Sequence, residues 1–252
     1  MQASELFNQP NTILLDGGMG TMLQAAGMKL GTRPEDLNIE NPELIRSIHA
    51  KYAAAGSRVV NANTFGASPH KLADSKYTLE EVITAGIANC KQAVAPYGAL
   101  VTLDVGPLGE LLEPSGTLAF EDAVAEYGRI VRAGVAAGAD ILYFETFTDL
   151  YEMKAALLAA KENSTLPIMA SMSFEANGRT FTGCTVESFA ATARGLGANA
   201  VGINCSLGPK EIFPMAKRLA EAVPGDFPVF VKPNAGLPRA DGSGYDITPQ
   251  LY

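Results

Sequence analysis

Cysteine and histidine are scarce in this sequence. Its 252 residues include three cysteines, Cys90, Cys184 and Cys205, and two histidines, His49 and His70. The cysteines form no CxxC pair and no even-numbered set, which excludes a disulfide framework and favours a reducing cytoplasm. Two histidines without the spacing of a zinc-binding helix exclude a histidine-rich metal centre, and no serine-triad signature accompanies them. We expect packing or solvated roles for both histidines.

Long apolar runs and blocks of positive charge are also missing. No apolar stretch approaches the roughly 20 residues that cross a bilayer, and the N-terminal segment MQASELFNQP does not have the form of a signal peptide. Lysine and arginine total 19 against 27 acidic residues, for a formal net charge of -8. Such a charge repels phosphate backbones and anionic membrane surfaces. We therefore expect no nucleic acid and no membrane among the partners.

Short apolar runs typical of strands alternate along the chain with segments of helical periodicity. The seven expected strands are residues 13–16, 57–63, 100–105, 140–145, 167–173, 199–205 and 228–233. The clearest helical segments are residues 42–56, 121–140 and 149–163. Near-continuous apolar strands separated by helices indicate an α/β protein with a parallel sheet that is covered on both faces.

Polar or reactive side chains follow almost every expected strand. They are Asp16, Asn61, Asn63, Asp104, Glu145, Ser173, Cys205, Lys232 and Asn234. A doubly wound sheet gathers ligand contacts at one switch point, whereas a (β/α)₈ TIM barrel delivers side chains from all its strands to one ring. The distribution favours the TIM barrel. Because seven strands leave two edges open, we expect a barrel truncated before its eighth strand. We expect the longest loop at residues 238–250.

Three strand ends have competing interpretations. In LLDGGMGT (14–21), the glycines expose backbone N–H groups that can bind an anion beside Asp16, or they simply form a tight turn. Glu145 follows an apolar run in DILYFETF (140–147), so it should meet either an internal cation or a ligand amine, and its strand-end position favours the ligand. Lys232 is either an ion-pair partner of Glu145 or Asp104, or a Schiff-base nucleophile whose pKa is lowered by burial.

The three cysteines differ in context. Cys90 lies in a helical segment and is most simply a packing residue. Cys184 lies in a loop after the fifth expected strand, from which it can reach the mouth of the barrel. For Cys205, periodicity alone predicts a buried thiol at a strand end.

Eight segments, taken in order, resemble the homocysteine-binding barrel of the homocysteine S-methyltransferase family. They are LLDGGMGT (14–21), DLNIENPELI (36–45), NANTFGAS (61–68), DVGPLGELLEPSGT (104–117), YFETFTDLYEMKAALLA (143–159), GRTFTGCT (178–185), GINCSLGP (202–209) and PNAGLP (233–238). The resemblance runs from about residue 11 to the end of the chain. It is closest to the N-terminal domain of cobalamin-dependent methionine synthases.

The resemblance implies a chemistry for the strand-end residues. In this family a thiolate-bound zinc ion takes up the homocysteine sulfur and keeps it deprotonated for attack on an electrophilic methyl group. The implied zinc ligands are Cys205, Asn234 and two further cysteines of a GGCCG motif that would fall beyond residue 252. Glu145 is implied to receive the substrate amino group, and Asp16 with Gly17 to line the amino-acid end of the pocket.

The resemblance also implies partners and a domain organisation. Residues 1–252 would be a single homocysteine-binding barrel of a methionine-forming methyltransferase, without its eighth βα unit. The implied methyl donor is methylcobalamin on another domain, with folate- and cobalamin-binding domains as partners; S-methylmethionine and betaine are alternatives. We expect this chain to hold zinc weakly or not at all, because one thiolate and one amide oxygen cannot form a closed tetrahedral site.

Two other functions stay open on the sequence. One is a metal-free amino-acid-binding or assembly module that is completed by a partner chain. The other is an aldolase that uses Lys232 as its Schiff-base nucleophile.

Overall fold

Six parallel strands form one curved sheet in the computed structural model, which describes residues 3–9, 11–29, 31–236 and 247–248. The strand order follows the sequence, from β1 to β6. The strands are β1 (Val59–Asn61), β2 (Leu100–Val105), β3 (Ile141–Phe147), β4 (Ile168–Met172), β5 (Ala200–Asn204) and β6 (Val229–Lys232). Because each strand pairs only with its neighbours in sequence, the described sheet is a half-barrel with β1 and β6 at its two sides.

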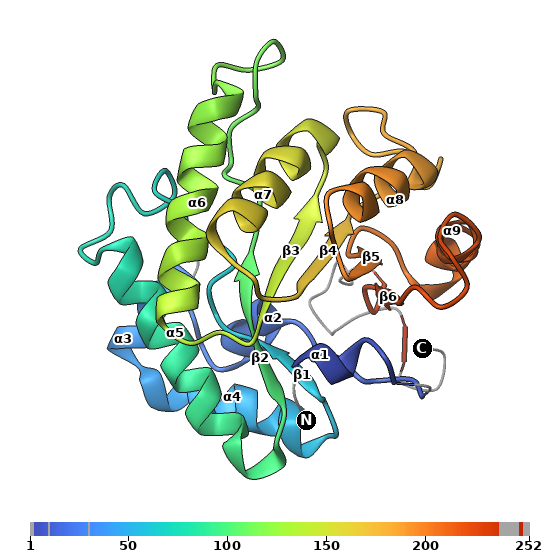
Figure 1. Cartoon of the computed structure of the whole chain (residues 1–252). Coiled ribbons are helices and arrows are strands. Elements are labelled where there is room, and N and C mark those ends of the chain that lie inside the picture. Colours follow the sequence, from blue (N-terminus) through green and yellow to red (C-terminus); the bar gives the residue numbers. More distant parts are fainter. Residues whose placement is uncertain (1–2, 10, 30, 237–246, 249–252) are drawn as a thin grey trace.

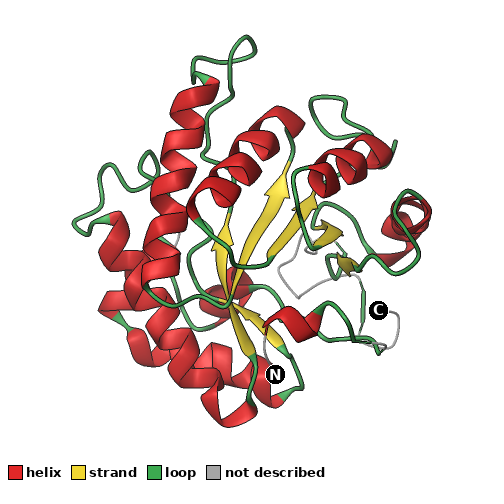
Figure 2. Cartoon of the chain, viewed as in Figure 1, coloured by secondary structure: helices red, strands yellow, loops and turns green. Residues whose placement is uncertain are grey.

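Helices precede and connect the strands, and most of them cover the outer face of the sheet (Figures 1 and 2). They are α1 (Ala3–Leu6), α2 (Met19–Ala25), α3 (Leu37–Glu40), α4 (Pro42–Ala54), α5 (Leu79–Val94), α6 (Phe120–Ala136), α7 (Leu150–Asn163), α8 (Val186–Gly195) and α9 (Pro209–Glu221). Two short 3₁₀ helices, Pro34–Asp36 and Ala95–Tyr97, precede α3 and follow α5. This arrangement confirms the predicted α/β class with a parallel sheet.

The predicted helices are confirmed at α4, α6 and α7, and side-chain capping explains where α4 and α7 begin. Helix α4 has Pro42 in its first turn, and the Asn41 side chain accepts a hydrogen bond from the Leu44 N–H. Helix α7 begins after Asp149, whose carboxylate accepts from the Tyr151 N–H. Both caps satisfy backbone donors that have no partner within the helix.

The expected strand at residues 13–16 is reduced to a single bridge. Leu15 pairs in parallel with Val59, the Asp16 N–H donates to the Val59 carbonyl oxygen (3.1 Å), and the Arg58 N–H donates to Leu14 (2.9 Å). The segment therefore lies beside β1 where a further strand would lie, but only one residue pair has ladder geometry. Among the described residues, six of the seven predicted strands are regular strands, and the prediction is wrong for the first. Most of the expected loop at 238–250 lies outside them.

The period of two along each strand decides what enters the barrel. On β2 the inward residues are Leu100, Thr102 and Asp104, and on β3 they are Ile141, Tyr143 and Glu145. The first residues of these series pack in an inner apolar cluster that also contains Leu6 of α1. Each series is thus apolar near the start of its strand and polar near the end, so the polar ends of neighbouring strands meet.

A glycine on β5 makes room inside the barrel. A Cβ atom added to Gly202 would lie 2.4 Å from the ring of Phe230, closer than any real contact. The absence of a side chain at Gly202 therefore allows Phe230 of β6 to enter the interior, where its ring packs edge-on against Tyr143 with a centroid distance of 5.5 Å.

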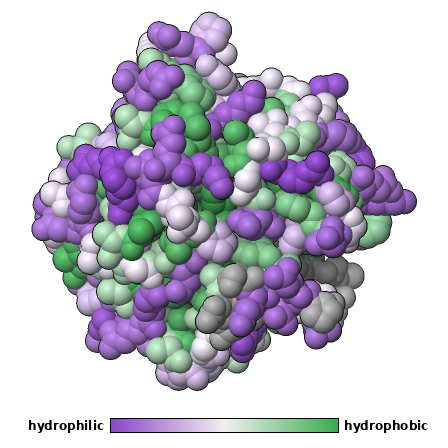
Figure 3. Space-filling model, viewed as in Figure 1, coloured by the Kyte–Doolittle hydropathy of each residue, from purple (hydrophilic) through white to green (hydrophobic). Residues whose placement is uncertain are grey.

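The outer surface is mixed in character. On the face shown in Figure 3, hydrophilic residues dominate and hydrophobic residues appear in smaller areas between them. None of the described helices combines the length and the apolar character that a membrane span requires.

Candidate functional site

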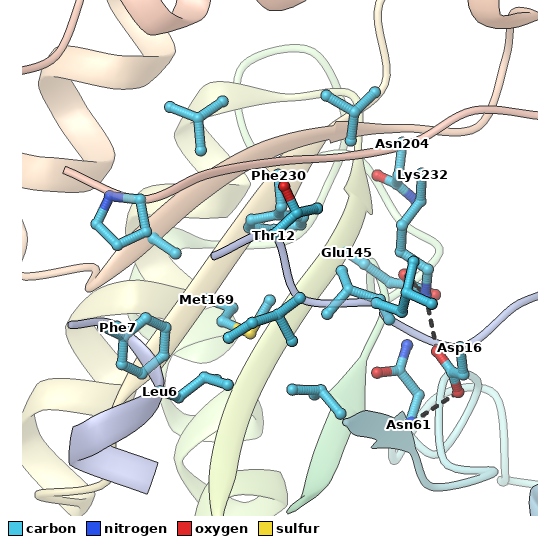
Figure 4. A pocket seen from close by; sticks show the side chains of 18 of the residues that line it. Leu6, Phe7, Thr12, Asp16, Asn61, Glu145, Met169, Asn204, Phe230 and Lys232 are labelled. Carbon is cyan, nitrogen blue, oxygen red and sulfur yellow. Dashed lines mark hydrogen bonds and ion pairs between the residues drawn. The ribbon is translucent and has the colours of Figure 1, made fainter. Parts of the chain in front are cut away.

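One cavity of about 750 Å³ occupies the inner side of the half-barrel. Figure 4 shows its two ends. Leu6, Phe7, Met169 and Phe230 line the apolar end, which corresponds to the N-terminal ends of the strands. The polar end is lined by side chains from the ends of five strands and from the segment that bridges to β1: Asp16, Asn61, Asp104, Glu145, Asn204, Cys205 and Lys232. The strand-end side chains that the sequence predicted to gather at one place do so for Asp16, Asn61, Asp104, Glu145, Cys205 and Lys232, whereas Asn204 was not among the predicted residues.

Lys232 and two carboxylates form an ion-pair cluster at the polar end (Figure 4). The Lys232 Nζ atom lies 3.2 Å from Asp16 Oδ1 and 3.6 Å from Glu145 Oε2. The exposed fractions of these three side chains are 17% for Lys232, 4% for Asp16 and 14% for Glu145. Asp16 Oδ2 also accepts a hydrogen bond from the Asn61 N–H at 2.8 Å. Asp16 thus has a partner on each carboxylate oxygen.

The cluster keeps Lys232 charged. Burial acts to lower the pKa of Lys232, but the carboxylates of Glu145, Asp16 and Asp104 outweigh it and raise this pKa well above its ordinary value. The predicted net lowering of the Lys232 pKa is therefore wrong, because the carboxylates outweigh burial. Of the two ion-pair partners expected for Lys232, Glu145 is confirmed, and Asp16 takes the place expected for Asp104. The reason is that Asp16 lies beside β1, within reach across the barrel.

Asp104 is a deeply buried carboxyl group of the site. Its exposed fraction is 6%, and its Oδ1 atom has no hydrogen-bond partner among the described residues. Its backbone is fixed by Thr64, whose Oγ1 donates to the Asp104 carbonyl oxygen (2.8 Å) and accepts from its N–H (3.1 Å). Burial and the neighbouring charge of Glu145 raise the pKa of Asp104 well above its ordinary value.

The glycine turn after Asp16 is packed against an aromatic ring. A Cβ atom on Gly17 would lie 2.9 Å from the ring of Tyr52, so a larger residue would displace the ring. The Tyr52 hydroxyl donates to the Gly18 carbonyl oxygen at 3.0 Å. Gly17 and Gly18 also line the cavity. The turn therefore has a packing reason for its glycines and the predicted position at the site.

Cys205 lies at the end of β5 in an unusual backbone conformation. Its φ is 58°, that of Ser206 is 59°, and that of Thr146 at the end of β3 is 64°. Positive φ values are rare for residues other than glycine, above all for a β-branched threonine. The Cys205 Sγ atom lies 3.3 Å from Asn204 Nδ2 and 3.9 Å from Thr146 Oγ1. Two of the residues with positive φ, Thr146 and Cys205, therefore meet at this sulfur atom.

The Asn204 side-chain amide hydrogen-bonds to both Thr146 and Cys205. Its Oδ1 accepts from the Thr146 N–H (3.1 Å) and from Ser171 Oγ (2.8 Å), and its Nδ2 donates to Thr146 Oγ1 (2.7 Å) and to Cys205 Sγ. Both lone-pair positions and both amide hydrogens therefore have partners. Sequence reasoning did not identify Asn204 or Thr146. The signal available for Asn204 was its place on the inward series of β5, next to Cys205.

Of the other predicted residues, Asn234 lines the cavity and Cys184 does not. Asn234 lines the cavity, and its N–H donates to the Leu207 carbonyl oxygen at 3.0 Å. Cys184 is half-buried and is not among the described residues that line the cavity, and burial raises the pKa of its thiol to about 11.

Cys90 is buried in α5, as predicted for a packing residue. His49 is buried in the core and His70 is exposed, which confirms packing and solvated roles.

The donor set of the described residues does not form a complete metal site. Cys205 is the one thiol among the described residues that line the cavity, and no group of three or more His, Cys, Asp or Glu side chains in the described part of the chain is arranged to hold a metal ion. A tetrahedral zinc site needs four ligands, or three and an open position. The described residues therefore fit at most a part of such a site.

Comparison with known proteins gives related sequences and structures. The profile of the family "Homocysteine S-methyltransferase" matches residues 13–252. A methionine synthase of Mycobacterium tuberculosis is 30% identical over 254 residues, which cover 93% of this chain and 21% of that protein. This chain thus spans about a fifth of the length of that relative.

Solved structures show the same fold. The metallated form of the homocysteine methyltransferase MmuM from Escherichia coli has a TM-score of 0.82 at 25% identity, over 92% of this chain and 86% of that one. Its apo form has a TM-score of 0.74 at 26% identity, over 92% and 85%. The carboxyl transferase domain of Rhizobium etli pyruvate carboxylase has a TM-score of 0.56 at 16% identity, over 92% and 38%, which is a likeness of fold alone.

Proposed function

This chain belongs to the homocysteine S-methyltransferase family, and we propose that its cavity binds homocysteine and presents the homocysteine sulfur for a methyl transfer that yields methionine. One observation carries the proposal. The same cavity has the charged groups Asp16, Glu145 and Lys232 and, on the neighbouring strand end, the thiol of Cys205. The amino-acid part of a thiol substrate and its sulfur therefore each have chemically suitable neighbours.

The proposal assigns the charged cluster to the amino-acid part of homocysteine. Glu145 receives the substrate ammonium group, since its side chain is 14% exposed and faces the cavity. This end is lined by Asp16 and Gly17. Both residues lie in the turn between Leu15, which bridges to β1, and helix α2, and in the proposal the backbone of this turn lies close to the ligand. A charge-assisted hydrogen bond from an ammonium group to a buried carboxylate is stronger than one between neutral groups.

The proposal assigns Cys205 to the sulfur end. Cys205 and Asn234 are the two ligands that this chain would contribute to a zinc site of the thiolate type. Since the described residues supply only a part of such a site, we assign no step of the reaction to a metal. What this chain does on its own is to hold the Cys205 sulfur in one orientation, because Asn204 and Thr146 contact it and are themselves hydrogen-bonded to each other.

The methyl donor and the partners belong to the proposal as well. We infer methylcobalamin on another domain as the donor, with folate- and cobalamin-binding domains as partners and the cytoplasm as the location. The support is the similarity to a methionine synthase of which this chain covers 21%. The eight-stranded barrel, in which the bridging segment at Leu15 and a further βα unit with two cysteines would complete the six described strands, is likewise a proposal.

A binding experiment tests the amino-acid assignment. Homocysteine is titrated into the unaltered chain and into Glu145→Gln, and the dissociation constant is measured by calorimetry under reducing conditions. Loss of the charge-assisted contact should weaken binding by roughly ten- to a hundredfold. The matched control Glu175→Gln replaces an exposed glutamate after β4 and should bind as the unaltered chain does. Equal affinity for Glu145→Gln would refute the role of Glu145.

A metal analysis tests the sulfur end. We expect this chain to retain clearly less than one equivalent of zinc after dialysis, with that residual zinc lost in Cys205→Ser and kept in Cys184→Ser. Tight zinc binding at one equivalent would contradict the incomplete donor set. Zinc binding that is unchanged in Cys205→Ser would remove Cys205 from the ligands.

The structure weighs against the aldolase alternative. A Schiff-base nucleophile must be a neutral amine, whereas Asp16 and Glu145 hold Lys232 in its charged form. We expect no borohydride-trapped adduct at Lys232 with small aldehydes and ketones. The metal-free binding or assembly module stays the alternative that the zinc and homocysteine measurements distinguish.

A further inference from the structure

A chain of buried hydrogen bonds crosses three neighbouring strands and ends at a sulfur atom. The exposed fractions of its members are 1% for Tyr143 of β3, 0% for Ser171 of β4 and 1% for Asn204 of β5. Tyr143 Oη lies 2.9 Å from Ser171 Oγ, Ser171 Oγ lies 2.8 Å from Asn204 Oδ1, and Asn204 Nδ2 lies 3.3 Å from Cys205 Sγ. Ser171 is not among the described residues that line the cavity. Its influence on the cavity therefore passes through Asn204.

The hydrogen atoms of this chain all point toward the sulfur. An amide oxygen can only accept, so the 2.8 Å contact requires that Ser171 donates its single hydroxyl hydrogen to Asn204. The 2.9 Å contact on the other side of Ser171 then requires that Tyr143 donates, although the Glu145 carboxylate also lies beside the Tyr143 hydroxyl. The amide of Asn204 in turn donates from Nδ2 to Cys205 Sγ. The sulfur is therefore the final acceptor of the chain.

Two donors determine how the Asn204 amide is oriented. The Thr146 N–H (3.1 Å) and the Ser171 hydroxyl both donate to Oδ1, so an amide turned by half a rotation would place its own hydrogens against them. Thr146 has a φ of 64° at the end of β3, whereas Ser171 lies within the regular strand β4. Ser171 is thus the donor that a regular part of the sheet holds in place.

We propose that Ser171 is a positioning residue of the sulfur end, which acts through Asn204 to keep a hydrogen-bond donor, and not an acceptor, directed at the Cys205 sulfur. This inference rests on the proposed function, because it takes Cys205 to serve the sulfur end of the cavity. An N–H group stabilises a sulfur that carries negative charge, and a carbonyl oxygen repels it. The sequence drew attention to Ser173 after the strand, and the structure gives this role to Ser171 within it.

Ser173 provides the matched control. Its hydroxyl donates to the main-chain carbonyl oxygen of Asn204 (2.7 Å), and its exposed fraction is 5%. Ser171→Ala and Ser173→Ala therefore each remove one buried hydroxyl that donates to Asn204, but only Ser171→Ala frees the side-chain amide. In the reduced, ligand-free chain, alkylation of Cys205 by iodoacetamide should slow roughly three- to tenfold in Ser171→Ala and stay within about twofold in Ser173→Ala. Mass spectrometry measures the rate, with Cys184 in the same sample as the internal reference.

The side-chain amide resonances of Asn204 give a second measurement by NMR. Alkylation of Cys205 should shift these resonances clearly in the unaltered chain, because Nδ2 donates to the sulfur, and less in Ser171→Ala. Ser171→Thr keeps the hydroxyl and should retain both the rate and the shift of the unaltered chain.

Two outcomes would overturn the role of Ser171. One is equal slowing in the two alanine variants, which would mean that either lost hydroxyl merely loosens the strand end. The other is an unchanged rate and an unchanged shift in Ser171→Ala. Because these measurements need no ligand, they fail or succeed separately from homocysteine binding: a chain that binds no homocysteine but shows the expected difference refutes the proposed function and supports the hydrogen-bond chain from Ser171 to Cys205.

Discussion

Lys232 donates a hydrogen bond to Asp16 across the open side of the half-barrel, with Nζ 3.2 Å from Oδ1. Lys232 is the last residue of β6, and Asp16 directly follows the residue that bridges to β1, so this one contact joins the two sides of the described sheet. The two residues are 216 positions apart in the sequence. The same pair that sets the charge of the site therefore also contributes to closing the fold around it.

This relationship predicts a clear loss of stability in Lys232→Met. The variant keeps the length of the side chain but leaves the Asp16 carboxylate buried without its cation, which should lower the free energy of unfolding by about 3 kcal/mol. Urea denaturation at pH 7 measures the change. In the double variant with Asp16→Asn, part of the loss should be recovered, because no buried charge then lacks a partner. The exposed control Lys217→Met, whose Nζ lies 3.9 Å from Glu221, should change stability by less than about 0.5 kcal/mol.

Asn204 should be sensitive even to its near-isosteric replacement. Asn204→Asp retains the acceptor for the Thr146 N–H but loses both amide hydrogens, which are donated to Thr146 Oγ1 and Cys205 Sγ. We expect a loss of about 2–3 kcal/mol in unfolding free energy, because a buried carboxylate faces the sulfur without the donors. Thermal and urea unfolding measure it. Asn199→Asp is the control, since its oxygen accepts from the Ile168 N–H at the other end of the sheet and an aspartate can do the same. Similar stability for Asn204→Asp and this control would show that the two donated bonds contribute little.

Asp104→Asn should stabilise the ligand-free chain at neutral pH. A carboxyl group whose pKa is raised by folding binds more protons in the folded than in the unfolded state, so its contribution to stability falls as the pH rises from its ordinary pKa towards the raised one. Removing the group removes this penalty. A higher urea midpoint for Asp104→Asn at pH 7, with little difference near pH 3, would agree with this sign. A purely structural role for Asp104 predicts a lower midpoint instead.

His49 should make the fold sensitive to acid. Burial lowers the pKa of His49 to about 4, and neither ring nitrogen has a hydrogen-bond partner among the described residues. Because the unfolded state binds the proton near pH 6.5 and the folded state does not, stability falls as the pH drops from 6.5 to 4, by about 3 kcal/mol. In His49→Met, this part of the pH dependence should vanish, as measured by urea midpoints between pH 4 and 7.5. His70→Gln, an exposed histidine, should leave the profile unchanged; a parallel profile for His49→Met would show that His49 is not the titrating group.

The sequence predicted the parts of this protein that depend on local pattern. Helices α4, α6 and α7 follow from apolar periodicity, with capping residues at the start of α4 and α7, and the strand positions follow from short apolar runs. The alternation along β2 and β3 also explains why Asp104 and Glu145 end inside the barrel, since every second residue points inward. The ordered segments from LLDGGMGT to PNAGLP identified the family, and the family profile confirms it over residues 13–252. The GGCCG motif expected beyond residue 252 stays a prediction.

Tertiary structure alone decided how the polar residues divide their contacts. No local pattern could show that Lys232 reaches Asp16 rather than Asp104, or that three carboxylates raise its pKa when burial by itself would lower it, because both depend on how strands far apart in sequence face one another. Packing also reduced the first expected strand to a bridge at Leu15. Finally, the packing of β3 against its neighbours places the Asn204 side chain where it hydrogen-bonds to both Thr146 and Cys205, two residues with positive φ. Amino-acid order determined which groups enter the barrel, and the relative positions of the strands determined which of them interact.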